Sequence, residues 1–190
     1  MLKRTLLAAA ALALTASSAA ATQVGWKTYS DMQAGYTISY PAGWKVDPHY
    51  RYGGFGPDHE IRGVAFEIPA SLARGTNLST SLTGVSVEVA NGHGKCDATR
   101  FLPDPQEPRT LHNAGRVWST ANMQDAGAGN LYDIAVFAIT NSKPCIAVRY
   151  TIHSTNIGNY DPGTVRAFNY DALVRVFSAI RRSIKLEGER

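Results

Sequence analysis

The sequence predicts an α+β fold in which a central antiparallel sheet carries a C-terminal amphipathic helix packed on one face. The first observation behind this prediction is an alternation of apolar and polar residues with a period of two, which recurs along the chain and is typical of half-buried strands. The second is a single stretch of strong helical periodicity near the C-terminus. We therefore expect the helix to lie on the apolar face of the sheet.

Three segments in the first half of the chain show the alternation most clearly. In the first of them, Tyr36, Ile38 and Tyr40 share one face before Pro41 and Gly43 end the run. The other two place valine or phenylalanine at alternate positions. The predicted half-buried strands are "YTISY", "GVAFEI" and "GVSVEV", at residues 36–40, 63–68 and 84–89.

A second group of segments predicts a meander of neighbouring strands. Residues 130–139 show little alternation, so we expect this strand to be covered on both faces and to lie near the centre of the sheet. The turn "TNSKP" joins it to the last strand. The predicted strands are "GRVWSTA", "NLYDIAVFAI" and "PCIAVRYTIH", at residues 115–121, 130–139 and 144–153.

The last predicted strand has two different faces. Arg149 and His153 lie on its polar face, where they are either simply exposed to solvent or part of a binding groove. The apolar face is assigned to the core and comprises Ile146, Val148, Tyr150 and Ile152.

The helix is predicted from Asn169 onward, in "NYDALVRVFSAIRRSIK". Asn169 can cap its first turn, and basic residues near its end suit the negative end of the helix dipole. Arg175 and Arg182 fall opposite the apolar stripe, and Arg181 falls at its margin. The stripe comprises Tyr170, Leu173, Val174, Phe177, Ile180 and Ile184.

Residues 1–21 have the order of a secretory signal peptide: two basic residues, a short apolar run and small residues ending at Ala21. We expect cleavage there, a single domain over residues 22–190, a periplasmic or secreted location and no stable membrane insertion of the mature chain. Removing this segment takes away two of the 19 basic residues and none of the 15 acidic ones, leaving a net charge of +2. Scattered charges of this size give no reason to expect nucleic acid as a partner.

The two cysteines, Cys96 and Cys145, form an even count in a chain predicted to be exported. In an oxidising compartment this pattern favours a disulfide. The alternative is a reactive thiol pair, which the absence of a Cys-x-x-Cys spacing disfavours.

The segment "AGYTISYPAGW", residues 34–44, and the amphipathic helix ending in Ser-Ile-Lys resemble the PsbP-like fold family. That family includes an extrinsic photosystem II subunit, a nuclear-import factor and bacterial envelope proteins. The resemblance implies a central antiparallel sheet with helices packed against it. It carries over no catalytic or binding residue, because the shared motif is structural and members of one fold differ in function.

No catalytic set emerges from the polar residues. Neighbouring residues of a strand point to opposite faces, so His153 cannot readily act as a base for Ser154. The loop with His49, Asp58, His59 and Glu60 could hold a metal, but its spacing matches no established pattern, and a polar turn is favoured. The ligand-binding residues we predict are Arg149, His153, Asn156, Tyr160, Tyr52 and His59.

The favoured hypothesis is an exported, non-enzymatic binding or accessory protein of the cell envelope. It requires no cofactor or metal, and its partner is a protein or envelope ligand that the sequence does not specify. The alternative is a periplasmic hydrolase or metal-dependent enzyme centred on His59 or His153.

Overall fold

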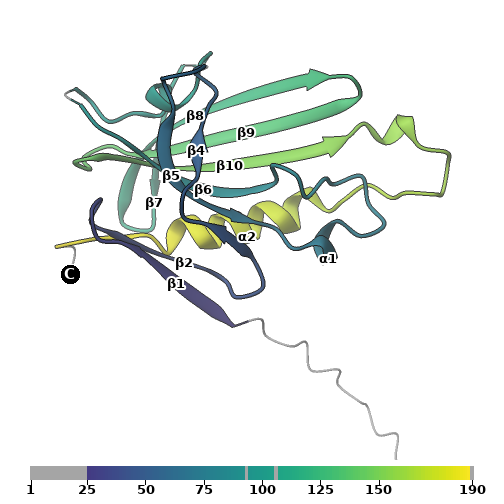
Figure 1. The fold of residues 1–190 in the computed structure, drawn as a ribbon, viewed down its shortest axis with the longest axis horizontal. Helices are drawn as coiled ribbons and strands as arrows, with labels where there is room; N and C mark the ends of the chain where they lie inside the picture. Colours follow the sequence, from purple (N-terminus) through teal and green to yellow (C-terminus); the bar gives the residue numbers. More distant parts are fainter. Residues whose placement is uncertain (1–24, 93, 105–106, 189–190) are drawn as a thin grey trace, which may run out of the picture.

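The computed structural model describes residues 25–92, 94–104 and 107–188, so the predicted signal peptide lies outside the described residues. Two sheets, one long helix and three short helical turns build the fold (Figure 1). The strands are β1 (Trp26–Asp31), β2 (Tyr36–Pro41), β3 (Lys45–Asp47), β4 (Arg51–Tyr52), β5 (Ile61–Glu67), β6 (Gly84–Ala90), β7 (Arg109–Asn113), β8 (Arg116–Gly127), β9 (Asn130–Ile139), β10 (Cys145–Thr155) and β11 (Lys185–Leu186). The helices are α1 (Ala70–Ala73) and α2 (Tyr170–Arg182), with 3₁₀ turns η1 (Ala98–Phe101) and η2 (Ile157–Asn159).

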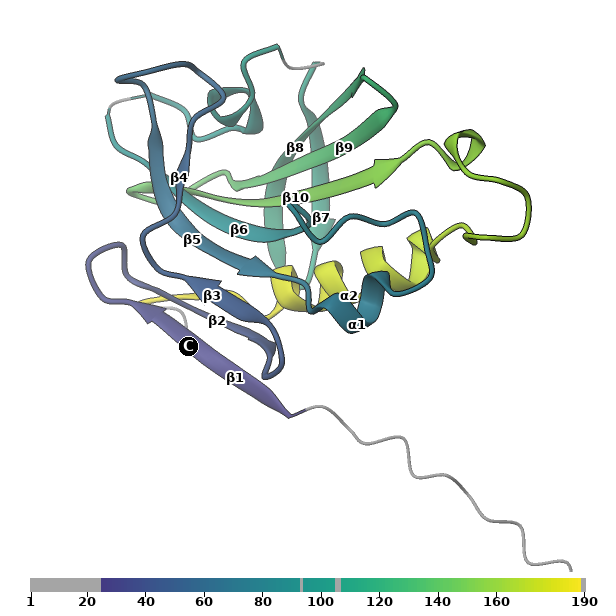
Figure 2. The same cartoon turned by 45° about the vertical axis from the view of Figure 1, so that its right-hand side comes forward.

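The larger sheet has the strand order β3-β5-β6-β10-β9-β8-β7, and β4 also pairs with β5. The smaller sheet has the order β1-β2-β11. All pairings between these strands are antiparallel. Figure 2 shows α2 and the smaller sheet on the same side of the larger one. The predicted α+β class, with a central antiparallel sheet and a C-terminal helix on one face, is confirmed.

Helix α2 joins the two sheets through one apolar core. Its start is fixed as predicted, because the Asn169 side chain accepts a hydrogen bond from the Ala172 amide at 2.9 Å. Phe177 is fully buried and meets the rings of Trp44 and Tyr150 edge-on, at centroid distances of 5.7 and 5.4 Å. The predicted core residues of the last strand, Ile146, Val148, Tyr150 and Ile152, all belong to this cluster.

The opposite face of the larger sheet is covered by the segment that contains η1. The predicted disulfide between Cys96 and Cys145 is confirmed, with an S–S distance of 2.07 Å, and it fastens this segment to the start of β10. Phe101 and Leu102 of this segment are buried against the sheet and form a second core with residues of β8, β9 and β10. The sheet is therefore covered on both sides at this end.

Several strands lie outside the segments that were predicted to be strands. They include β3, β4 and β7, and these strands are short. A second difference concerns β6, which was expected to be half-buried: Ser86 and Glu88 on its polar side are buried. Alternation predicts which face is polar, but it does not show that a loop will cover that face.

The described part of the chain contains no helix of sufficient length and apolar character to span a membrane.

Candidate ligand-binding groove

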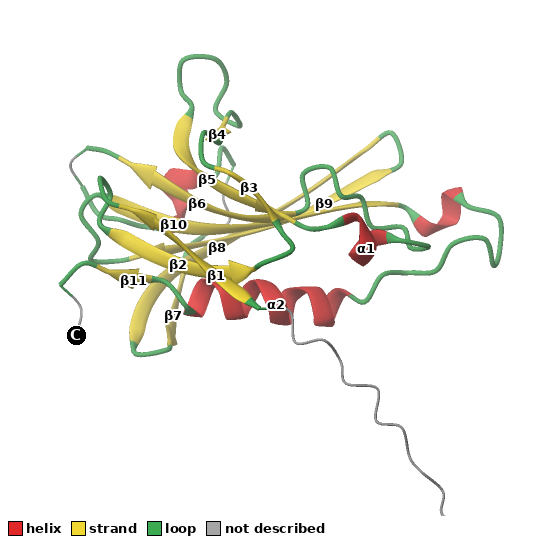
Figure 3. Ribbon diagram, turned by 60° about the horizontal axis from the view of Figure 1, so that its bottom comes forward, coloured by secondary structure: helices red, strands yellow, loops and turns green. Residues whose placement is uncertain are grey.

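A groove runs along α2, between this helix and the face of the sheet formed by β8, β9 and β10. Figure 3 shows the helix running below the sheet while the β8–β9 hairpin continues past it. We call this the helix-side groove; its volume is about 710 Å³. That size suits a small organic ligand.

Regular secondary structure explains how the groove is lined. Tyr170, Val174, Ser178 and Arg181 follow one another at spacings of three or four, so they share one face of α2. On β9 the lining residues Asp133, Ala135 and Phe137 alternate and share one face of the strand. Asn122 and Gln124 of β8, and Tyr150 and Ile152 of β10, complete the same face of the sheet.

Arg181 is the most unusual lining residue, because its charged side chain is only 4% exposed. Its guanidinium carbon lies 4.4 Å from the ring centre of Phe137 and 4.8 Å from that of Trp118. Nε donates to the Tyr150 hydroxyl at 2.9 Å, and Nη2 donates to Oδ1 of Asn113 at 3.2 Å. Nη1 is buried and has no hydrogen-bond partner.

The hydroxyl beside Arg181 responds to this environment. Burial raises the pKa of Tyr150, while the charge of Arg181 and hydrogen bonds from Ser178 and Arg181 oppose the rise. The hydroxyl therefore stays protonated at neutral pH and remains available as a second polar group at this end of the groove.

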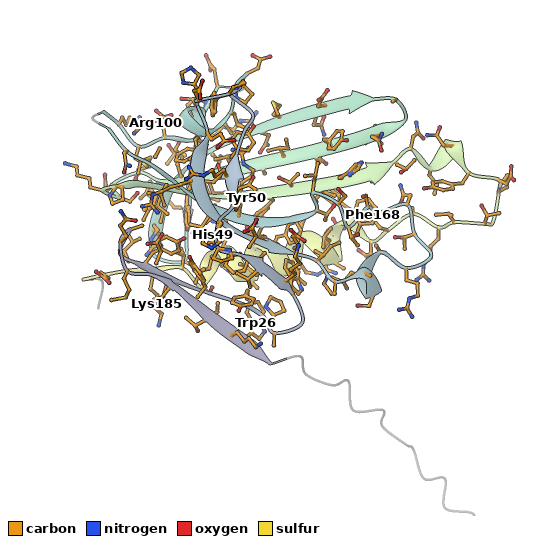
Figure 4. The ribbon with its side chains drawn as sticks, viewed as in Figure 1. Trp26, His49, Tyr50, Arg100, Phe168 and Lys185 are labelled. Carbon is orange, nitrogen blue, oxygen red and sulfur yellow. A yellow bond between two sulfur atoms is a disulfide. The ribbon has the colours of Figure 1, made fainter. Side chains whose placement is uncertain are left out.

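The other end of the helix-side groove is acidic. Asp133 accepts a hydrogen bond from Nε2 of Gln124 at 2.9 Å. Burial, followed by the charge of Asp133, raises the pKa of Tyr170 nearby. A neighbouring hollow of about 520 Å³ shares Gln124, Asp133, Ile152 and Tyr170 and extends to Phe168, labelled in Figure 4. The groove thus has a basic end and an acidic end with apolar residues between them.

Arg149 differs from the sequence prediction, which placed it on an exposed face. It is 1% exposed and donates from Nε and Nη2 to the two carboxylate oxygens of Glu88, at 2.7 and 2.8 Å. Nη2 also donates to the Phe101 carbonyl oxygen, and the Tyr52 ring covers the guanidinium at 3.5 Å. Because Glu88 neutralises the charge inside the protein, Arg149 serves the packing of this face.

A second, smaller pocket lies on that opposite face. Residues 50–53, which include β4, line this pocket, and we call them the strap. We therefore call the cavity the strap-side pocket; Tyr50 is labelled in Figure 4. Its volume is about 330 Å³, and Ala65, Tyr132 and Thr151 form part of its wall. Tyr52 is thus the predicted ligand-binding residue that lies at a cavity.

His153 lies farther along β10 than Arg149 and is half-buried. Its ring stacks on Tyr132 with centroids 4.5 Å apart. Its Nδ1 and Nε2 lie 2.9 Å from the Ser81 carbonyl oxygen and from Oδ1 of Asn130. Both ring nitrogens therefore contact groups other than the neighbouring Ser154, which the hydrolase alternative needs as a nucleophile.

The remaining predicted ligand-binding residues do not gather around one cavity. Asn156 caps η2 by accepting from the Gly158 amide at 2.9 Å, and Tyr160 follows this turn on the surface. His59 is exposed in the loop before β5. In the described residues, no three His, Cys, Asp or Glu side chains are grouped so that they could hold a metal ion.

The sequence analysis missed the helix-side groove. Arg181 follows Phe177 by four positions and precedes Ile184 by three, so its position in the apolar stripe was readable from helical spacing. An arginine at the helical spacing of buried apolar residues could therefore have indicated that Arg181 is buried. The approach of Asp133 depends on how far β8 and β9 extend past the helix, which periodicity does not give.

Comparisons with known proteins give a distant similarity to a solved structure. Neither a protein-family model nor a curated protein matches the chain. Among solved structures, the chain is similar to the solution structure of cyanobacterial PsbP (CyanoP) from Synechocystis sp. PCC 6803, at 16% identity and a TM-score of 0.46. The match covers 90% of this chain and 98% of that chain. That structure carries the family name to which the sequence resemblance points.

Proposed function

We propose that this chain is an exported, non-enzymatic binding protein of the cell envelope, and that its ligand occupies the helix-side groove. The observation that carries the proposal is the buried Arg181 at the groove wall, whose charge has no carboxylate partner among the described residues. A buried charge without a counter-charge opposes folding. Residues that lower stability in this way occur at functional sites, and a ligand could supply the interactions that Arg181 lacks.

Two observations support export. Residues 1–21 carry the order of a signal peptide, and the cysteine pair is joined in a disulfide, which persists in oxidising compartments. The arrangement of side chains around His153 supports a binding role over hydrolysis, because Ser81 and Asn130 occupy its ring nitrogens. We expect the protein to hold its ligand without altering it.

Backbone amide NMR on residues 22–190 tests the proposal. A set of about 500 small soluble fragments is screened, and each binding fragment is mapped by the shifts it causes. We expect fragments to perturb β8, β9 and the groove-facing side of α2. Ala135→Leu, which fills the helix-side groove, should abolish these shifts.

Ala65→Leu is the matched control, because Ala65 is a half-buried alanine of the same sheet that lines the strap-side pocket. It should leave binding to the helix-side groove unchanged. Fragments that bind the wild type and Ala135→Leu equally, but lose affinity for Ala65→Leu, would move the binding site to the strap-side pocket.

A further inference from the structure

We propose that the ligand of the helix-side groove is an organic acid with an apolar body, and that its carboxylate pairs with Arg181. This inference rests on the proposed function of the groove and adds the chemical class of the ligand. It is carried by the fixed position of the guanidinium at the groove wall, the absence of a counter-charge among the described residues, and the apolar residues beyond it.

The guanidinium of Arg181 is held rather than free. Its central carbon lies close to the rings of Phe137 and Trp118, and two of its nitrogens donate to Tyr150 and Asn113. Nη1 is the remaining nitrogen, and no group of the described residues accepts from it. A planar donor that is already fixed loses little entropy when it binds a carboxylate.

Charge favours an anion over a neutral acceptor. The ion pairs within the described part of the chain engage Arg149, Arg62, Arg51 and Lys45, and none of them involves Arg181. A neutral amide could satisfy the hydrogen bond of Nη1 but would leave the positive charge buried. A carboxylate satisfies both, because charge-assisted hydrogen bonds are about twice as strong as neutral ones.

The shape of the groove favours an apolar body behind that carboxylate. Ala135, Ile152 and Val174 line the wall between Arg181 and the acidic end at Asp133. Phe137 and Asp133 are four positions apart on β9, so the two ends are separated by about 13 Å. Asp133 would repel a second negative group there, which points to a single carboxylate at the Arg181 end.

Phe137 lies between the groove and the guanidinium of Arg181, because it lines the groove and contacts the guanidinium. Nη1 is buried in the free protein. Carboxylate binding therefore requires side chains around Nη1 to move, and changes of rotamer are common when a ligand binds.

Isothermal titration calorimetry with a matched pair of probes tests the inference. 4-Phenylbutanoate and 4-phenylbutanamide have the same shape and differ in charge. We expect the acid to bind the wild type at least about tenfold more tightly than the amide. Arg181→Gln should reduce that ratio to about one.

Arg175→Gln is the control for charge, because Arg175 is exposed on α2 and its loss changes the net charge equally. It should keep the acid-to-amide ratio of the wild type. N-Acetyl-Leu-Phe with a free or amidated C-terminus distinguishes the source of the carboxylate. Tighter binding of this peptide acid than of 4-phenylbutanoate would assign the groove to a protein C-terminus and overturn the small organic acid.

The outcomes separate the two proposals. Equal binding of acid and amide, both blocked by Ala135→Leu, would overturn the carboxylate inference and keep the groove as the binding site. No binding of either probe or peptide at concentrations up to 10 mM would overturn the inference. The fragment screen then shows whether the helix-side groove binds any ligand.

Discussion

The two sides of the larger sheet each bury one arginine, and they treat its charge differently. On the side covered by η1 and the strap, Arg149 donates to both carboxylate oxygens of Glu88. On the side covered by α2, Arg181 has aromatic and neutral polar neighbours. In the first arrangement a carboxylate of the protein neutralises the charge of the arginine. In the second, no carboxylate of the described residues does so, and the arginine lies at the wall of the helix-side groove.

The difference separates a structural arginine from a functional one. Removing Arg149 leaves Glu88 buried without its counter-charge, and breaking a buried pair in this way is costly. Removing Arg181 leaves no buried charge behind. Stability measurements can therefore distinguish the two roles before any ligand is known.

The largest effect is expected for Arg149→Met. We expect a loss of about 3–5 kcal/mol in the free energy of unfolding, because the fully buried Glu88 keeps only the Ser86 hydroxyl, at 2.8 Å, from its present partners. Urea denaturation of residues 22–190 measures it. The double variant with Glu88→Leu should recover most of the loss; a single variant that loses less than about 1 kcal/mol would contradict the structural role.

The disulfide on the same side should have the next largest effect. Replacing Cys96 and Cys145 by serine should lower the free energy of unfolding by about 2–4 kcal/mol, because the bridge closes a loop of 49 residues. The same urea experiment on the double variant measures the loss. Wild-type protein under reducing conditions should give a similar value, and unchanged stability in both would refute a stabilising bridge.

Tyr50, which lies on the same side of the sheet as Arg149, should make the free energy of unfolding depend on pH in the alkaline range. Burial, together with the charge of Glu88, raises the pKa of Tyr50 above its ordinary value of about 10. The unfolded chain ionises first, so this contribution is complete below pH 10 and is lost as pH rises toward the folded-state pKa. Comparing wild type with Tyr50→Phe between pH 8 and 11 should show a slope smaller by about 1 kcal/mol per pH unit above pH 10 in the variant.

Equal slopes in the two proteins would show that Tyr50 ionises equally in both states. Tyr36 is expected to leave a residual slope in the variant, since burial raises its pKa as well.

The smallest effect on stability is expected for Arg181→Met. The loss of hydrogen bonds to Tyr150 and Asn113 is offset by removal of an uncompensated buried charge, so the free energy of unfolding should change by about 1 kcal/mol or less. Urea denaturation beside Arg149→Met gives a direct comparison. A loss as large as that of Arg149→Met would make Arg181 a structural residue and remove the argument for a ligand.

Periodicity was sufficient to predict much of the fold. The strand predicted at residues 130–139 has those bounds as β9, and α2 begins after the predicted cap Asn169. Both signals are local, because alternation and capping depend on residues close in sequence. The short strands β3, β4 and β7 lack such a signal and form only because neighbours pair with them.

The candidate site was much less accessible from sequence. Arg149 was expected on a polar face, either exposed or part of a groove, and Arg181 at the margin of the apolar stripe, and both are buried. Their burial depends on distant partners: Glu88 is 61 positions from Arg149, and Asn113 is 68 positions from Arg181. Such pairings arise only when the strands are placed in order, so the pattern of a single strand or helix cannot contain them.

The most direct test of the groove as a carboxylate site follows the Nε–Hε NMR signals of both buried arginines while 4-phenylbutanoate is added. Arg181→Lys and Arg149→Lys assign the two signals. We predict that the signal of Arg181 shifts in a saturable way and that the signal of Arg149 stays in place, because Glu88 already neutralises the charge of Arg149 and accepts from its Nε and Nη2. A shift of the Arg149 signal alone, or no shift of either signal while the acid binds, would contradict the account.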